Sequence, residues 1–292
     1  MNTRFSLGVC CVAMSFMLAL PARANTSFVN GNFQTVGAVT GAGASGSFSL
    51  EDPTGNENAL TGWSLYTGAG LTTNQVLNCV VMGGTNTNVC GTLEFGGGFS
   101  YWVNPGLSPD GGNYYAADGD DSYTDNGTSP TGGVAGGYAV PLYQTITGIS
   151  PGSSYILSFD QAAAQQSVKS GATTEQWEVE FCTTLPTVDC TGSNAQFSSL
   201  MSDASHGDIP WQSQVMTFTA TAATEVLEFI AIGTPNGEPP FVLLDGVGFQ
   251  QATPEPGTLA LIGLGLVAIP LAARRRQMRR KPRILSRGST AA

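Results

Sequence analysis

The sequence predicts an all-β protein in which one large β-sandwich domain lies between two apolar terminal segments. Glycine is abundant, with 38 of 292 residues, and short alternating segments are separated by turn residues. Residues 25–252 show no sustained periodicity of 3.6 residues, which disfavours helices. The length of this stretch suits a single sandwich domain.

The N-terminus predicts secretion. Arg4 precedes an apolar run from Phe5 to Leu20, and Pro21-Ala22-Arg23-Ala24 follows. A basic residue, an apolar run and a small-x-small sequence are typical of a signal peptide. We therefore expect residues 1–24 to be removed and the exported chain to begin at Asn25.

Several segments of the exported stretch alternate as strands do. In the clearest one, Trp177, Val179 and Phe181 point one way, while Glu178 and Glu180 point the other. This predicts one buried face and one solvated face. The expected strands cover residues 27–36, 63–67, 114–117, 143–147, 155–159, 175–181, 211–220, 225–232 and 241–250.

The connections between these strands carry their own expectations. Gly148 and the sequence Ser150-Pro151-Gly152-Ser153 predict a hairpin that joins strands 143–147 and 155–159. Ala162 to Gln166 is compatible with a helical turn. The Gly-rich stretches Gly37 to Gly46 and Thr124 to Gly137 are predicted to be long surface loops.

Four cysteines remain after removal of the signal peptide: Cys79, Cys90, Cys182 and Cys190. An even number in an oxidising compartment predicts disulfides. Three connectivities are open, and the sequence-local pairs Cys79–Cys90 and Cys182–Cys190 are the simplest. A zinc site is the alternative, but the short spacing of cysteine ligands is missing and the chain has one histidine.

Acidic and basic residues occupy different parts of the chain. Ten of the eleven Lys and Arg lie in the terminal segments, and Lys169 is the exception. The stretch from Asn25 to Gly257 carries all 21 acidic side chains against this one basic side chain. Nucleic-acid binding needs a cationic surface and is therefore excluded. Divalent cations and neutral polysaccharides are compatible partners.

The C-terminal segment has three parts in a fixed order. Pro254, Glu255 and Pro256 precede an apolar run from Thr258 to Ala273, and a basic cluster from Arg274 to Lys281 ends the segment. This order resembles the PEP-CTERM sorting signal of Gram-negative bacteria. The apolar run is shorter than the roughly 20 residues of a full membrane helix, which suits a temporary anchor.

The resemblance implies a route for the protein. Residues 253–281 would hold the precursor in the inner membrane through a short transmembrane helix until an exosortase recognises and removes them. The product would reach the cell surface or the extracellular space, where the family is associated with exopolysaccharide and biofilms. An ordinary C-terminal membrane anchor is the alternative. Residues 282–292 form a tail to which we assign no role.

Five motifs are spread over the exported stretch: Val29-Asn30-Gly31-Asn32-Phe33-Gln34, Leu60-Thr61-Gly62-Trp63, Leu142-Tyr143-Gln144-Thr145-Ile146, Pro151-Gly152-Ser153-Ser154-Tyr155 and Leu243-Leu244-Asp245-Gly246-Val247. Together they resemble the galactose-binding-like jelly rolls of exported carbohydrate-binding modules. The resemblance implies a jelly-roll β-sandwich for residues 25–252.

Oxygen ligands on a Gly-rich loop predict a Ca²⁺ site. Asp118 and Asp120 begin the densest acidic cluster of the chain, and carboxylates are the ligands that Ca²⁺ prefers. The resembled jelly rolls often carry a structural Ca²⁺ that would enlist Asp245 and carbonyl groups near Asn30. Gln34 stands where such modules often have an acid. A solvated turn is the alternative.

Aromatic residues in loop-like regions are candidates for sugar contact, because a flat apolar ring stacks on the C–H face of a sugar. We select Tyr101, Trp102 and Tyr115 for this role. His206 is expected in a surface loop. The primary hypothesis is a non-enzymatic surface or matrix protein with an adhesion, biofilm or glycan-binding role. The alternatives are a polysaccharide hydrolase, which needs a carboxylate pair such as Glu178 and Glu180, and a purely structural matrix protein.

Overall fold

Alternation of apolar side chains produces long strands in the second half of the chain. A computed structural model describes residues 26–39, 47–48, 50, 59–65, 78–83, 100–119, 141–183, 195–235 and 240–252. All regular structure in these ranges is β-strand, and they contain no helix able to cross a membrane. The signal peptide (1–24), the apolar C-terminal segment and the tail lie outside them. The chain divides into two compact units, Met1–Gln251 and Ala252–Ala292.

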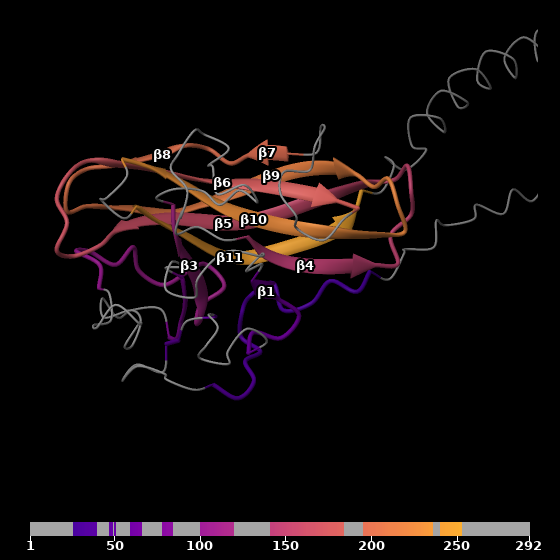
Figure 1. Cartoon of the computed structure of the whole chain (residues 1–292), viewed down its shortest axis with the longest axis horizontal. Coiled ribbons are helices and arrows are strands. Elements are labelled where there is room, and N and C mark those ends of the chain that lie inside the picture. The colour runs from indigo at the N-terminus through magenta and orange to yellow at the C-terminus, as the bar shows by residue number, and fades with distance from the viewer. Residues whose placement is uncertain are drawn as a thin grey trace, which may run out of the picture. The chain divides into compact units, whose positions relative to one another are not determined.

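The strands form two antiparallel sheets (Figure 1). The six-stranded sheet has the order β1-β4-β10-β6-β7, and β8 also pairs with β6. The five-stranded sheet has the order β2-β3-β11-β5-β9. The strands are β1 (Ser64–Leu65), β2 (Asn78–Val81), β3 (Tyr114–Asp118), β4 (Leu142–Thr147), β5 (Ser154–Gln165), β6 (Thr173–Cys182), β7 (Ala195–Phe197), β8 (Met201–Asp203), β9 (Asp208–Thr219), β10 (Thr224–Thr234) and β11 (Pro240–Gln251).

The main strands alternate between the two sheets. Strands β3, β5, β9 and β11 belong to the five-stranded sheet, whereas β4, β6 and β10 belong to the six-stranded sheet. Along the chain, each of these strands is therefore followed by a main strand of the opposite sheet. This alternation is typical of a jelly roll. The predicted jelly-roll β-sandwich is confirmed.

The same topology shows that the predicted hairpin is wrong. Strand β4 pairs with β1 and β10, and β5 pairs with β9 and β11, so the two predicted partners lie in different sheets. The turn between them is tight, because the backbone nitrogen of Ser153 donates to the carbonyl of Ser150 at 3.0 Å. A short turn is thus compatible with a crossing between sheets as well as with a hairpin.

The hydrophobic core lies between the sheets and is rich in aromatic rings. Trp177, Val179 and Phe181 are buried in it, as the alternation of β6 predicted. Rings from opposite sheets pack together: Phe159 of β5 and Phe229 of β10 have centroids 5.3 Å apart. Because truncation of such a ring costs about 3–5 kcal/mol, these contacts hold the two sheets face to face.

Two predictions of local structure are wrong. The strand expected over residues 27–36 is reduced to an isolated bridge between Val36 and Leu60, and the positive φ angles of Asn30 and Phe33 (52° and 53°) interrupt regular pairing. The helical turn expected at Ala162–Gln166 is instead the last part of β5, which continues to Gln165. Pairing with strands on both sides outweighs the helix propensity of alanine there.

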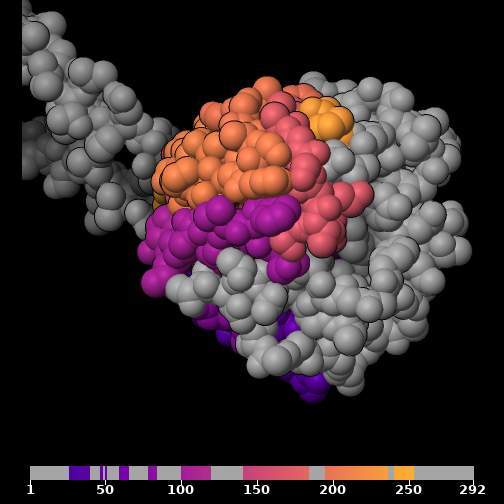
Figure 2. All heavy atoms as spheres, turned by 90° about the vertical axis from the view of Figure 1, so that its left-hand side faces the viewer, coloured from indigo at the N-terminus to yellow at the C-terminus, as the bar shows by residue number. Residues whose placement is uncertain are grey.

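The outer face of the five-stranded sheet is covered by a segment distant in sequence. Tyr101 forms a bridge with Gln166, and the indole Nε1 of Trp211 donates to the carbonyl of Gly106 at 3.2 Å. Figure 2 shows the 100–119 stretch, in magenta, against pink residues of 141–183 and orange residues of 195–235. We call the apolar residues buried there the outer cluster: Cys79, Val81, Tyr101, Tyr114, Ala116, Ala162, Ala164, Phe241 and Leu243.

Candidate functional site

Trp102 is held in a fixed position at the surface. Its backbone nitrogen donates to the carbonyl of Gln165 at 3.0 Å, and its indole Nε1 donates to the carbonyl of Lys169 at 2.7 Å. The ring packs on the imidazole of His206, with centroids 4.1 Å apart, and the side chain is 41% exposed. We call Trp102 with His206 and Lys169 the Trp102 platform. It offers an immobilised aromatic surface to a ligand.

His206 supports this platform from an exposed turn. Its Nε2 lies 2.7 Å from the Oγ of Ser170, and its backbone nitrogen donates to the Oε1 of Gln165 at 2.6 Å. The positive φ of 67° turns the chain at this point. The sequence predicted a surface loop histidine, which the structure confirms, but it carried no signal that the imidazole would contact Trp102.

The other two predicted sugar contacts are wrong, because both side chains are buried. Tyr115 has no exposed surface and lies in the core against Trp177, with ring centroids 6.3 Å apart. Tyr101 is 2% exposed and packs on Phe241 in the outer cluster, with ring centroids 5.6 Å apart. Neither side chain offers a ring face to a sugar.

The structure does not bring the predicted calcium ligands together. Asp118 pairs with Phe241, four residues along β11 from Asp245. At the rise of a strand this separates the two positions by about 13 Å, which is too far for one ion. Asp120 lies outside the described residues.

Asp245 has acidic neighbours that the sequence did not reveal. It is buried opposite Asp160 of β5, and its Oδ2 accepts a hydrogen bond from the Oγ of Ser108. Burial raises the pKa of Asp245 to about 7; the hydrogen bond from Ser108 lowers it, and the charges of Asp110 and Asp160 raise it. Strand register, which sequence spacing does not encode, creates this group.

The N-terminal segment also does not fit the implied ion. The Nε2 of Gln34 donates to the carbonyls of Asn32 at 2.8 Å, Asn113 at 3.3 Å and Gly111 at 3.4 Å. These carbonyl oxygens therefore already face a positively polarised amide group. The glutamine that departs from the resembled pattern provides this contact, and we derive no chemistry from a calcium ion here.

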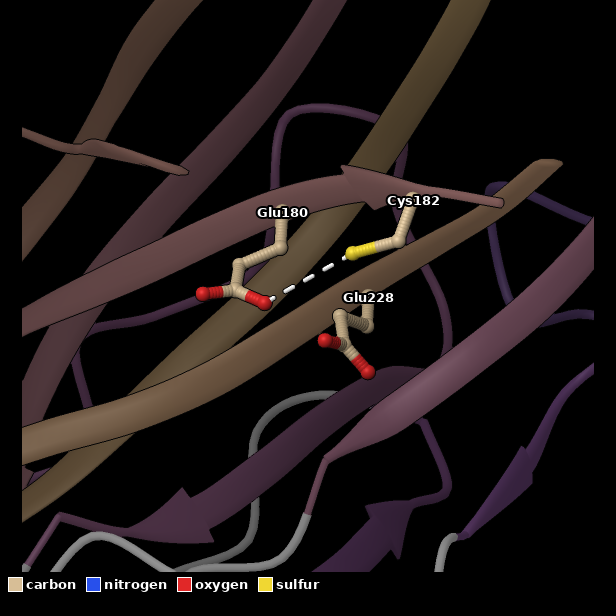
Figure 3. Close-up of side chains that lie close together, drawn as sticks. All are labelled: Glu180, Cys182 and Glu228. Carbon is tan, nitrogen blue, oxygen red and sulfur yellow. Dashed lines mark hydrogen bonds between the residues drawn. The ribbon is translucent and has the colours of Figure 1, made fainter. Parts of the chain in front are cut away.

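The face of β6 predicted to be solvated is in fact buried. Glu180 of β6 lies directly opposite Glu228 of β10, and both side chains are inaccessible, as is Glu178. A carboxylate oxygen of Glu180, one of Glu228 and the sulfur of Cys182 all lie within 4.8 Å of one another (Figure 3). The expectation that these outward-facing carboxylates are exposed to solvent was wrong. Alternation along a strand shows which side chains share a face, but not whether other parts of the protein cover that face.

The surroundings of Glu228 favour its protonated form. The pKa of Glu228 is raised to about 9, chiefly by burial and also by the hydrogen bond with Glu180 and the charges of Glu180 and Glu178. Glu228 is therefore protonated at neutral pH. The sulfur of Cys182 lies 3.7 Å from the Oε2 of Glu180. Cys182 is disulfide-bonded, so it cannot act as a thiolate ligand for a metal.

Cys79 is also disulfide-bonded. Cys90 and Cys190, which the sequence pairs with Cys79 and Cys182, lie outside the described residues. The connectivity therefore stays a prediction.

The C-terminal segment matches a known sorting signal. Residues 252–276 match the PEP-CTERM protein-sorting motif. The chain carries a PEP-CTERM sorting motif. This motif marks an exported protein with a membrane-anchored precursor, as the sequence predicted. Pro254, Glu255 and Pro256 lie within the matched range and outside the described residues. No curated protein matches the chain.

Several solved structures are similar to the chain at low identity. A CBM4 module is 15% identical, with 48% of this chain and 71% of that chain covered and a TM-score of 0.27. TmCBM61 in complex with β-1,4-galactotriose is 9% identical, with 79% and 99% covered and a TM-score of 0.36. Arabinose-bound MgGH51 α-L-arabinofuranosidase is 12% identical, with 77% of this chain but 31% of the enzyme covered and a TM-score of 0.33.

Proposed function

We propose that this protein is an exported, non-enzymatic glycan-binding protein of the cell surface or extracellular matrix, processed by an exosortase. The observation that carries the proposal is the exposed, immobilised ring of Trp102. Aromatic rings stack on the apolar C–H faces of sugars. Because the hydrogen bond from the indole to Lys169 and the contact with His206 already hold the ring, binding would cost little side-chain entropy.

The charge of the exported stretch narrows the ligand to neutral glycans. With 21 acidic side chains and one basic side chain between Asn25 and Gly257, the protein repels anionic polysaccharides. Binding of a neutral sugar has no such electrostatic penalty. An adhesion or biofilm role follows if the bound glycan is part of the matrix.

The alternative of a polysaccharide hydrolase has one structural argument for it. Glu180 and Glu228 are two carboxyl groups that lie opposite each other, and the raised pKa of Glu228 is a property that a general acid needs. Both are buried, however, whereas a glycosidase places its carboxyl groups on either side of an accessible bond. We therefore favour binding over catalysis.

A glycan array tests the proposal. The full chain should show saturable binding to a neutral glycan, and Trp102→Ala should weaken binding about tenfold or more, as for other aromatic hot spots. The matched control is Phe197→Ala, which removes an exposed aromatic side chain from β7 and should leave affinity unchanged.

Three outcomes would contradict the proposal. Absence of saturable binding across the array would favour a purely structural matrix protein. Equal affinity of the wild-type protein and Trp102→Ala would show that the platform is not the site. Release of shorter sugars from the bound glycan, lost in Glu228→Gln, would favour the hydrolase.

A further inference from the structure

Three polar side chains project into the sandwich interior at one end of β6. Thr173 and Glu175 lie two residues apart on β6 and so share a face, and Asp203 of β8 lies opposite Thr173. Met201, which lies opposite Glu175, belongs to the hydrophobic core, so this face is the inner one. The register therefore brings one hydroxyl and two carboxyl groups together inside the protein.

These groups are buried without hydrogen bonds of normal geometry. The exposed fractions of Thr173, Glu175 and Asp203 are 2%, 0% and 3%. Thr173 Oγ1, both carboxylate oxygens of Glu175 and the Oδ2 of Asp203 have no hydrogen-bond partner. Each buried polar group left in this state costs about 1–3 kcal/mol, and more if it is charged. The Thr173 hydroxyl is the one donor that acts on Glu175, and a single hydroxyl proton cannot satisfy three buried carboxylate oxygens.

In the part of the chain that the structure describes, no cationic side chain is among the influences on these two carboxylates. The pKa of Glu175 is raised to about 8, chiefly by burial and also by the charge of Asp203, while a hydrogen bond from the Thr173 hydroxyl opposes the rise. The pKa of Asp203 is raised to about 6, chiefly by burial and also by the charge of Asp208, while a backbone hydrogen bond from Ala204 opposes the rise. Lys169 is the one lysine or arginine between Asn25 and Gly257, and neither it nor His206 is among these influences. The balancing charge must therefore be a proton or a cation from outside.

We propose that Thr173, Glu175 and Asp203 bind a divalent cation of the Ca²⁺ type between the sheets. All the ligand atoms would be oxygens, which Ca²⁺ prefers, and two carboxylates match its charge. Glu175 can bind with both oxygens, while Asp203 and Thr173 supply one each. Extracellular modules bind Ca²⁺ with dissociation constants of about 10⁻⁴–10⁻³ M, a range that suits an exported protein.

This site is separate from the residues selected in the sequence. Asp245 lies on the outer face of the five-stranded sheet, whereas Glu175 lies on the inner face of the six-stranded sheet. Asp203 also begins the turn that carries His206. A cation bound to Asp203 would hold that turn to β6, although the metal site stands without any glycan.

Terbium luminescence tests the proposal. The full chain, purified in detergent and treated with EDTA, is titrated with Tb³⁺ while tryptophan is excited. Trp177 lies two residues from Glu175 on the same face of β6, about 7 Å along the strand, and can sensitise the ion. We expect saturable Tb³⁺ emission that Ca²⁺ displaces, and a thermal midpoint that rises on addition of Ca²⁺.

The variants locate the ion. Glu175→Gln and Asp203→Asn should each weaken Tb³⁺ affinity about tenfold or more and abolish the rise in thermal midpoint with Ca²⁺. Thr173→Val keeps the shape of the side chain and should weaken affinity by a smaller factor, which covers the case in which a carboxyl variant fails to fold. Asp160→Asn, beside Asp245 on the other sheet, is the matched control and should bind as the wild type does.

Two results would overturn the proposal. If the wild-type chain shows no saturable emission and no change of midpoint with Ca²⁺, protons or water satisfy the buried oxygens. If emission is lost in Asp160→Asn but kept in Glu175→Gln and Thr173→Val, the ion binds at the Asp245 group instead. Glycan binding enters neither readout, so failure here is distinguishable from failure of the Trp102 platform.

Discussion

The outer faces of the two sheets are both buried in part, but by different chemistry. The five-stranded sheet carries the outer cluster, in which Tyr114 and Phe241 pack beneath the segment that contains Tyr101. The six-stranded sheet carries Glu178, Glu180 and Glu228 at equivalent outward positions. One face is thus a second apolar core, whereas the other keeps buried carboxyl groups, among which Glu228 has a raised pKa. Alternation along a strand therefore identifies a face without revealing its environment.

The largest effect is expected in the outer cluster. Phe241→Ala removes a buried ring and should lower the free energy of unfolding by about 3–5 kcal/mol, as in an ordinary core. Chemical denaturation measures this change. Val215→Ala is the control: its side chain is exposed on β9, and it should change stability by less than about 0.5 kcal/mol. Equal, small effects of both variants would show that the outer cluster is not a second core.

A smaller effect of opposite sign is expected on the six-stranded sheet. The pKa of Glu228 is about 9 in the folded protein, above the value near 4.5 of an unperturbed glutamic acid. Its contribution to stability is therefore fully present below about pH 4.5 and is lost as the pH rises through about 9. Glu228→Gln cannot ionise, and its amide can still donate to Glu180. It should be about 1–3 kcal/mol more stable than the wild type at pH 9 and similar to it at pH 4.5.

Denaturation at several pH values measures this difference. Among the residues that the structure describes, Glu180 and Glu178 of β6 and Tyr143 of β4 are the titratable groups that face Glu228 from the neighbouring strands. If the pH dependence of stability is the same in the wild type and in Glu228→Gln, the pKa of Glu228 is not raised in the folded protein.

The smallest effect concerns the polar part of the five-stranded sheet. Ser213 of β9 donates to the Oδ1 of Asp160 at 2.5 Å on the exposed side of the sheet. Because water can replace this donor, Ser213→Ala should cost at most about 1 kcal/mol at pH 7. Chemical denaturation of Ser213→Ala and of Phe241→Ala compares the free-energy cost of a change in the polar part and in the apolar part of the five-stranded sheet. A cost near that of Phe241→Ala would mean that Asp160 is less accessible to water than its position indicates.

Local pattern predicted some elements correctly and failed at others for a physical reason. The alternation of Trp177, Val179 and Phe181 is a property of five consecutive residues, and the structure confirms that all three are buried. The hairpin between β4 and β5 failed because a turn fixes chain reversal but not the sheet to which each strand belongs. The Ala162 segment failed because two neighbouring strands decide its conformation.

In the candidate sites, too, the sequence predicted the type of residue, while its surroundings depended on the tertiary structure. Trp102 was selected from its aromatic character, yet its exposure depends on hydrogen bonds to Gln165 and Lys169 and on the ring of His206. Tyr115 has the same aromatic character and lies in the core. Glu175 and Asp203 are far apart in sequence and meet only because β8 pairs with β6. Sequence spacing contains no information on such register.

The sequence by itself determined the PEP-CTERM sorting motif, the separation of acidic from basic residues and the all-β class, because each depends on composition or on neighbouring residues. The tertiary structure alone decided which strands pair, which outward faces are buried and which polar groups meet. Those outcomes depend on contacts between residues far apart along the chain. Their free energies come from burial and pairing in three dimensions, which no local pattern encodes.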